Sequence, residues 1–139
     1  MTVIIDASAL SAYLLNEEGS EPGSKIRQLL IDGVVATELV FTESSNAILT
    51  ALRRRRIDEE EATTAMEVLL SLYDTNVKVV KQETSLLHEA FYEVKREENN
   101  AIYDFIYLAL AKRLHGRLAS RDPKQIETAK RLGIKIVAL

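Results

Sequence analysis

The 139-residue chain contains no cysteine and only two histidines, His88 and His115. Without cysteine it has no disulfide framework, no thiolate metal site and no thiol nucleophile. Two histidines are too few for a multi-histidine zinc centre. No apolar run approaches membrane-spanning length, and the N-terminus lacks a basic region followed by a long apolar segment. We therefore expect a cytoplasmic protein that does not bind a membrane.

The chain also lacks an excess of positive charge, because 21 acidic residues outnumber 18 Lys and Arg and the formal net charge is −3. This value argues against a protein coated with basic residues for nucleic-acid binding, although a local basic patch can still steer a polyanion. Basic residues do cluster in two places. They are the run Arg53–Arg56 and a second group of Lys112, Arg113, Arg117, Arg121 and Lys124.

Short apolar segments alternate with amphipathic ones, and no repeat or Pro/Gly-rich linker divides residues 1–139, so we expect a single domain. Strands are predicted at residues 3–5, 34–37, 77–80, 117–120 and 134–139. Helices are predicted over 8–15, after caps at Ser24, Thr42, Asp58 and Asp122, from Thr84, and over 101–115 with Gly116 as the stop signal. This alternation predicts an α/β fold with a parallel sheet, without giving the strand order.

Four acids occupy positions where a parallel sheet binds ligands, just beyond strand ends or at the mouths of helices. Asp6 follows the first strand, and Asp122 follows the fourth. Glu43 opens the helix after the second strand, and Asp104 lies in the first turn of the most apolar helix. Each acid taken alone has a simpler interpretation. Asp6 and Asp122 could cap helices, while Glu43 and Asp104 could complement helix dipoles.

Together the four acids favour a chemical role. Converging carboxylates repel one another and raise each other's pKa unless a cation neutralises them. Asp104 adds to this, because a helix that is apolar all round is buried and a buried carboxylate needs a partner. Oxygen ligands suit Mg²⁺ or Mn²⁺, ions that serve phosphate chemistry. The residues alone predict a metal-dependent phosphoryl-transfer or phosphodiester-cleaving enzyme.

Four segments in register carry a resemblance over essentially the whole chain. They are VIIDASALSAYLL, ESSNAIL, YDFIYLALAKRLHGRLASRD and a closing helix with GIKIV. The chain thereby resembles the PIN-domain family, especially its small single-domain members, which include VapC-type toxin ribonucleases. The resemblance implies a three-layer sandwich, with a five-stranded parallel sheet of order 3-2-1-4-5 covered by about seven helices.

The resemblance also implies a site that binds one or two Mg²⁺ or Mn²⁺ ions and hydrolyses RNA. Asp6, Asp104 and Asp122 would ligate one ion, and Glu43 would complete that shell or bridge to a second. Water activated by the metal would attack the scissile phosphate in line. Ser8, Asn46 and Ser120 match supporting positions. Ser120 stands where the family commonly has Thr, and the family's usual apolar or basic continuation after the last acid is replaced by Pro123-Lys124-Gln125.

Basic residues are candidates for RNA contacts. Arg117, Arg121 and Lys124 rank first, because they lie nearer the predicted acids in the sequence. Arg53 and Arg54 rank lower, since their run could simply be a solvated helix end that complements the dipole. For Tyr103 and Tyr107 we expect core packing rather than base stacking. In the toxin branch of the family, a small antitoxin would occlude the acidic cleft and the protein would form a homodimer.

Other functions remain open at this point. A PIN-domain ribonuclease of RNA processing or quality control is the main alternative, followed by a degenerate PIN module that only binds a partner. The presence of all four acids argues against the degenerate module. A haloacid-dehalogenase-like phosphatase would need D-x-D after the first strand, where this chain has D-A-S. A receiver-like domain would need a phosphorylatable aspartate after the third strand, and VKVVKQET supplies none.

Overall fold

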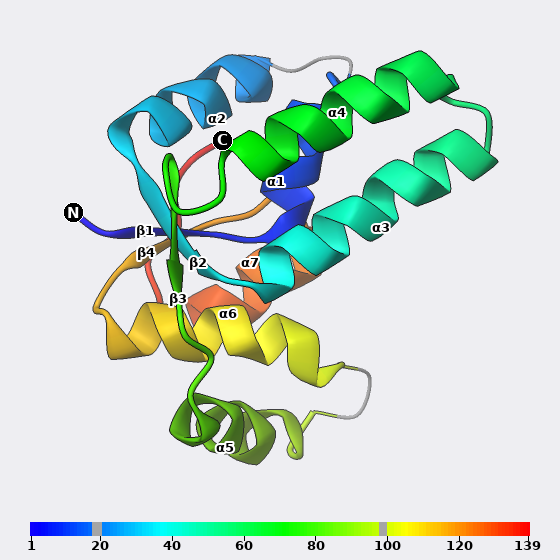
Figure 1. Cartoon of the computed structure of the whole chain (residues 1–139). Coiled ribbons are helices and arrows are strands. Elements are labelled where there is room, and N and C mark those ends of the chain that lie inside the picture. Colours follow the sequence, from blue (N-terminus) through cyan, green and yellow to red (C-terminus); the bar gives the residue numbers. More distant parts are fainter. Residues whose placement is uncertain (18–20, 98–99) are drawn as a thin grey trace.

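The computed structural model describes residues 1–17, 21–97 and 100–139, and over these ranges the chain forms an α/β fold with four strands and seven helices (Figure 1). In chain order the elements are β1 (Val3–Ile5), α1 (Ala7–Leu14), α2 (Glu21–Asp32), β2 (Val34–Thr37), α3 (Leu39–Arg53), α4 (Glu59–Ser71), β3 (Val77–Val80), α5 (Thr84–Val94), α6 (Ile102–Arg113), β4 (Arg117–Ala119) and α7 (Pro123–Arg131). Among these residues no helix is both long enough and apolar enough to cross a bilayer.

The sheet is parallel and has the order β3-β2-β1-β4. β1 is central, pairing with β2 through Ile4 and Val35 and with β4 through Ile5 and Ala119. The expectation of a fifth strand over residues 134–139 is wrong for the described chain. Only one parallel bridge, between Leu118 and Ile136, joins this segment to β4. The predicted order is therefore correct for four strands and lacks its fifth member.

Helices cover both faces of the sheet, which gives the expected three layers. Figure 1 shows α1, α2, α3 and α4 on one side and α5 and α6 on the other. The prediction that the apolar helix is buried all round is confirmed, because every residue of α6 from Phe105 to Ala111 is buried. Ile4, Ile5 and Leu118 are completely buried beneath it in the sheet. The central strands are thus sealed on both faces, and only their ends reach solvent.

Several helix starts follow the sequence signals. Asp58 and Glu61 form the predicted capping box at the start of α4, each side chain accepting a hydrogen bond from the other's backbone N–H. Two predicted caps are wrong. Ser24 lies inside α2, which already begins at Glu21, and Thr42 lies inside α3, which begins directly after Glu38. The short connection after β2 leaves no room for the loop that a cap at Thr42 requires.

Gly116 is needed for a reason other than ending a helix. The left-handed residue after α6 is His115, with φ of 49°. A Cβ on Gly116 would lie 2.5 Å from Cδ1 of Ile4 and 2.9 Å from the carbonyl oxygen of Thr2. The next residue, Arg117, donates its N–H to that same Thr2 oxygen at 2.9 Å. The absence of a side chain therefore lets β4 approach β1 closely enough to pair.

Gly116→Ala should therefore destabilise the fold, because the backbone at Thr2 cannot move without weakening the pairing of β1 and β4. We expect a loss of about 1–3 kcal/mol in the free energy of unfolding, the usual cost of overpacking, measured by urea denaturation. His115→Gly is the matched control. Relief of the positive φ and the greater freedom of the unfolded chain should leave its stability within about 1 kcal/mol of the wild type. Equal midpoints for Gly116→Ala and the wild type would contradict the close-packing argument.

Candidate active site

Asp6 ends the central strand and also caps α1. Its Oδ1 atom accepts a hydrogen bond from the backbone N–H of Ala9 at 3.1 Å, and its own N–H donates to the carbonyl of Ala119 at 3.1 Å. The residue is only 4% exposed. The cap interpretation is thus confirmed, and it fixes the direction of the carboxylate at the carboxyl edge of the sheet, between β1 and β4.

Two serines tie the end of β1 to the end of β4, as their predicted supporting role requires. The Ser8 hydroxyl donates to Oδ1 of Asp6 at 2.6 Å and accepts from the backbone N–H of Arg121 at 2.9 Å. Its oxygen lies 3.2 Å from the hydroxyl oxygen of Ser120. Ser120 is buried and accepts from the N–H of Asp122 at 3.1 Å. The chain around Asp122 is therefore held against Asp6 by side-chain hydroxyls.

Glu43 reaches the site from the second turn of α3, since that helix begins at Leu39 rather than at Thr42. The dipole interpretation of Glu43 is accordingly wrong. Its Oε1 atom accepts a hydrogen bond of 2.6 Å from the hydroxyl of Tyr107 on α6. Burial and the neighbouring Glu43 carboxylate raise the pKa of Tyr107 far above its ordinary value, so the phenol remains a donor.

Tyr107 is the residue that the sequence interpretation missed. It is buried, as core packing predicts, but its hydroxyl holds an acid of the site. A signal was present in the sequence, because Tyr107 lies three residues after Asp104 and so shares its helix face. Gln125 of α7 was also missed. Its side-chain amide donates to the backbone carbonyl of Asp104 at 2.9 Å and fastens the start of α6 to α7.

Asp104 and Asp122 complete the group of acids. Asp104 lies in the first turn of α6, as predicted, and is half-buried. Asp122 is the N-cap of α7, where its Oδ1 accepts from the N–H of Lys124 at 3.0 Å. The cap prediction for Asp122 is confirmed as well. Four separate helices thus present one acid each at the carboxyl edge of the sheet.

The acids carry negative charge that their surroundings compensate poorly. Burial raises the pKa of Asp6 above its usual range, and the Asp122 charge adds to this, while hydrogen bonds from Ser120, Ser8 and the Ala9 backbone oppose it. Burial also raises the pKa of Glu43, opposed by the Tyr107 hydrogen bond and reinforced by Asp104 and Asp6.

The pKa of Asp104 is raised by burial and then by Asp122, with Lys124 as the opposing cation. Each of the four acids is therefore coupled to at least one other.

This donor set fits a hard divalent cation in its chemistry. Carboxylate and hydroxyl oxygens gather at this edge of the sheet, and such groups prefer Mg²⁺ or Mn²⁺. As the side chains stand, no three acids or histidines of the described residues lie close enough to hold one ion. Glu43, Asp104 and Asp122 are only partly buried, so their carboxylates are accessible to a cation from solvent.

An open pocket of about 400 Å³ adjoins the acids. Ser8, Glu43 and Ala47 line one part of it, and Glu17 and Arg121 form another. The guanidinium of Arg121 pairs with the carboxylate of Glu17 at 3.2 Å, so this RNA-contact candidate already has an acidic partner.

Two other sequence candidates lie outside the network of acids. Arg117 begins β4 and pairs in register with Val3, which puts it at the amino edge of the sheet, opposite the acids. Asn46 is exposed on α3, one turn beyond Glu43, and its side chain makes no hydrogen bond with the four acids. The structure therefore brings Ser8 and Ser120 to the site and leaves Arg117 and Asn46 apart from its contacts.

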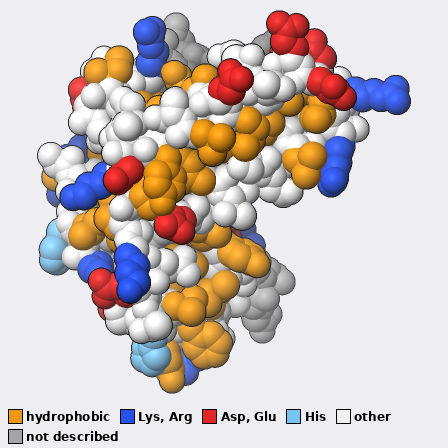
Figure 2. Space-filling model, viewed as in Figure 1, with side chains coloured by type: hydrophobic (Ala, Val, Ile, Leu, Met, Phe, Trp, Pro, Cys, Tyr) orange, Lys and Arg blue, Asp and Glu red, His pale blue; other side chains and the backbone are white. Residues whose placement is uncertain are grey.

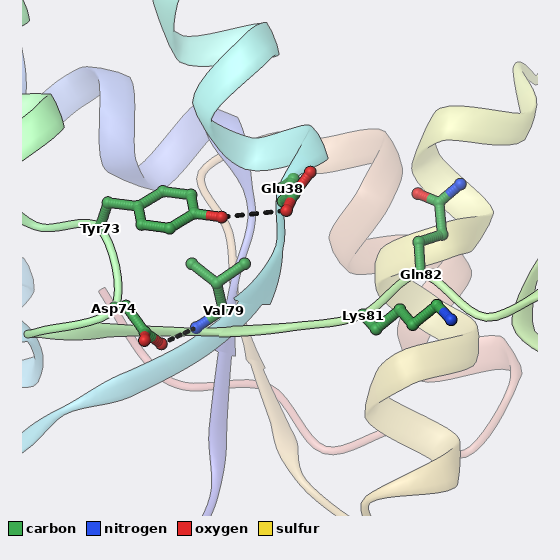
Figure 3. Close-up of a pocket in the computed structure, with 6 residues that line it drawn as sticks. All are labelled: Glu38, Tyr73, Asp74, Val79, Lys81 and Gln82. Atoms are coloured by element: carbon green, nitrogen blue, oxygen red, sulfur yellow. Dashed lines mark hydrogen bonds between the residues drawn. The ribbon is translucent and has the colours of Figure 1, made fainter.

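A second pocket, shown in Figure 3, opens at the carboxyl ends of β2 and β3. Its volume is about 490 Å³, and none of the four acids lines it. The hydroxyl of Tyr73 donates to Oε1 of Glu38 at 2.9 Å, while the N–H of Val79 points toward Asp74. Glu38 precedes α3 without capping it. This pocket shares the functional edge of the sheet but not the group of acids.

Comparison with known proteins places the chain among relatives over most of its length. A model of the PIN domain matches residues 3–131. Ribonuclease VapC3 of Pyrobaculum aerophilum is 27% identical over 127 residues, which cover 91% of this chain and 94% of that protein. The crystal structure of Mycobacterium tuberculosis VapC20, described as a sarcin-ricin loop cleaving toxin, is 19% identical with a TM-score of 0.64. That match covers 91% of this chain and 95% of the other and shows a shared fold.

Removal of the Asp6 charge should stabilise the metal-free protein. Because the folded-state pKa of Asp6 is raised, the folded carboxyl holds its proton more tightly than the unfolded one. Its contribution is favourable below the ordinary value of 3.8 and is lost as the pH rises through the folded pKa. Asn caps helices as well as Asp. Asp6→Asn should therefore raise the free energy of unfolding at pH 7 by about 0.5–2 kcal/mol in EDTA.

Asp58→Asn is the matched control, because Asp58 is also an N-cap but is exposed and lies outside the acid group. It should show no gain at pH 7. The stability gain of Asp6→Asn should shrink as the pH falls toward and below 3.8, because the Asp6 carboxyl of the wild type then becomes protonated in the folded and the unfolded state alike. Denaturation curves at several pH values measure both trends. A loss of stability in Asp6→Asn at pH 7 would contradict the uncompensated charge.

Proposed function

The chain belongs to the PIN-domain family, as its motifs predicted, and from that premise we propose that it is an endoribonuclease that hydrolyses RNA with a divalent metal ion. The observation that carries the proposal is the mutual repulsion of four acids from four elements at one edge of the sheet. The helix caps that Asp6 and Asp122 provide do not require Glu43 and Asp104 beside them. A site that binds a cation gives the convergence of all four acids a purpose.

Each acid has a role in the proposed reaction. Asp6, Asp104 and Asp122 hold one Mg²⁺ or Mn²⁺, and Glu43 completes that shell or holds a second ion. A divalent ion bound there lowers the pKa of water and neutralises charge on the scissile phosphate. Ser8 and Ser120 orient the carboxylates at the β1–β4 junction, and Tyr107 fixes Glu43. The chain has no cysteine, and the hydroxyls of Ser8 and Ser120 are engaged in hydrogen bonds at the β1–β4 junction, so hydrolysis by water is the favoured route.

We further propose that the protein is the toxin of a toxin–antitoxin pair, held inactive by a small antitoxin, and that it forms a homodimer. Support comes from the two relatives, of which one is named as a VapC ribonuclease and the other is described as a cleaving toxin. The acids favour such a partner physically. A basic side chain inserted among them would neutralise the same charge that the metal ion neutralises.

Purified protein should cleave single-stranded RNA in Mn²⁺ or Mg²⁺, and EDTA should abolish the cleavage. Asp6→Asn and Asp104→Asn should each lower the rate by about a hundredfold or more, because they remove ligands of the ion. Asp58→Asn should cleave at the wild-type rate. Gel analysis of end-labelled RNA gives the rates. Equal cleavage by the wild type and Asp104→Asn, or full activity in EDTA, would disprove the proposed site.

The toxin assignment predicts growth arrest when the wild-type protein is expressed from an inducible promoter in a bacterial host. Asp104→Asn should permit normal growth at equal protein levels, because growth arrest requires RNA cleavage and this variant is expected not to cleave. Asp58→Asn should arrest growth like the wild type. Optical density and immunoblots measure the two quantities. Cleavage in vitro without arrest in the host would favour a processing ribonuclease instead.

A further inference from the structure

The turn between α3 and α4 carries four successive arginines, Arg53 to Arg56, and all four are exposed. Within the described chain none of them forms an ion pair. The nearby acids Asp58 and Glu61 are engaged in the capping box of α4 instead. Figure 2 shows Lys and Arg side chains projecting at this end of the α3–α4 hairpin, which stands out from the body of the protein. Asp58, Glu59 and Glu61 line one pocket with Arg55 and Arg56, so the turn presents concentrated positive charge that adjoins these acids without forming an ion pair with them.

The backbone of this arginine turn is well fixed. The N–H groups of Arg54, Arg55 and Arg56 donate to the carbonyls of Thr50, Leu52 and Ala51 at 3.0, 3.0 and 2.9 Å. Arg55 itself has φ of 57°, in the left-handed region where helix ends favour glycine. A long side chain held there against backbone preference is a reason to look for a function.

Helix α3 links the turn directly to the acids. Glu43 and Arg54 are eleven residues apart, which brings them to within about 20° of one another around the helix and separates them by about 16 Å along it. Ala47 and Thr50 lie between them on the same face and are short and partly exposed. Ala47 also lines the open pocket beside Glu43. Small, partly exposed side chains therefore line one helix face between the acids and the arginines.

We propose that the Arg53–Arg56 turn binds the phosphates of single-stranded RNA at a distance from the scissile bond. The inference rests on the proposed ribonuclease function and identifies where the substrate is gripped. The acids repel a polyanion, Arg121 pairs with Glu17, and Arg117 lies at the opposite edge. Lys124 beside Asp104 is then the remaining first-ranked candidate at the acids, and the arginine turn supplies further phosphate contacts.

The test is RNA binding in EDTA, where no cleavage occurs, measured by fluorescence anisotropy with a labelled single-stranded RNA of mixed sequence. Arg53→Gln/Arg54→Gln/Arg56→Gln should weaken binding about tenfold at moderate salt. Because three phosphate contacts are lost, the slope of log affinity against log salt should fall by about 2.

The matched control is Lys25→Gln/Lys78→Gln/Lys135→Gln, which removes the same charge from exposed positions elsewhere. It should retain nearly the full salt slope of the wild type. Equal slopes for the wild type and the arginine variant, or equal losses in both triple variants, would overturn the inference.

Arg55→Gly separates a binding role from a structural one. Glycine suits the left-handed backbone, so the melting temperature should rise by about 2–4 °C, while the affinity for RNA should fall. A role of Arg55 in holding the turn together predicts the opposite change in melting temperature. A stabilised variant with unchanged RNA affinity would remove Arg55 from the binding site.

The two proposals fail in different ways. If the wild type cleaves RNA and the arginine variants bind it with unchanged salt dependence, the cleavage site stands and the arginine turn does not. If the wild type binds RNA through the arginines but never cleaves it in Mn²⁺ or Mg²⁺, the binding surface stands and the ribonuclease proposal falls.

Discussion

The burial of one carboxylate at the end of the central strand is the constraint on which the rest of the site depends. Asp6 cannot turn away from the sheet edge, because it caps α1 and its backbone is paired with β4. The register that pairs Ile5 with Ala119 then carries Ser120 and Asp122 to the same place. Every other element of the site is added around this junction: α6 brings Asp104 and Tyr107, and α3 brings Glu43.

Much of this arrangement could be predicted from the sequence because its signals are local. Asp6 and Asp122 each stand between a short apolar strand and a helix, so their places at strand ends follow from the pattern of neighbouring residues. The burial of α6 follows equally from a helix without a polar face. The order of the strands could not be predicted from such local signals. It came from a resemblance over the whole chain, since short strands of similar composition do not specify their neighbours.

The features that sequence reasoning missed depend on contacts between distant segments. Tyr107 and Glu43 are 64 residues apart, so the spacing of Tyr107 from Asp104 indicates the helix face of Tyr107 but not its hydrogen-bond partner. Gly116 is the residue type expected at the end of a helix, yet its role is to let Thr2 and Ile4 pack closely against its backbone. The last segment is β-branched enough for a strand but makes a single bridge with β4. In each case the observed conformation or contact depends on packing against another element, and the local propensity of the residues does not predict it.

Helix α3 joins two places where the chain gives up stability. At one end Glu43 lies among repelling carboxylates, and at the other Arg55 adopts a backbone conformation that favours glycine. The acids beside the start of α3 repel a polyanion, and the arginines at its other end attract one. On the proposed function, RNA phosphates would bind the exposed arginines and would approach the acids only with a cation bound there. Salt screens exposed charges more strongly than buried ones. Salt should therefore weaken the proposed RNA binding at the arginines more than it weakens the electrostatic interactions of the acids, although a single helix positions both groups.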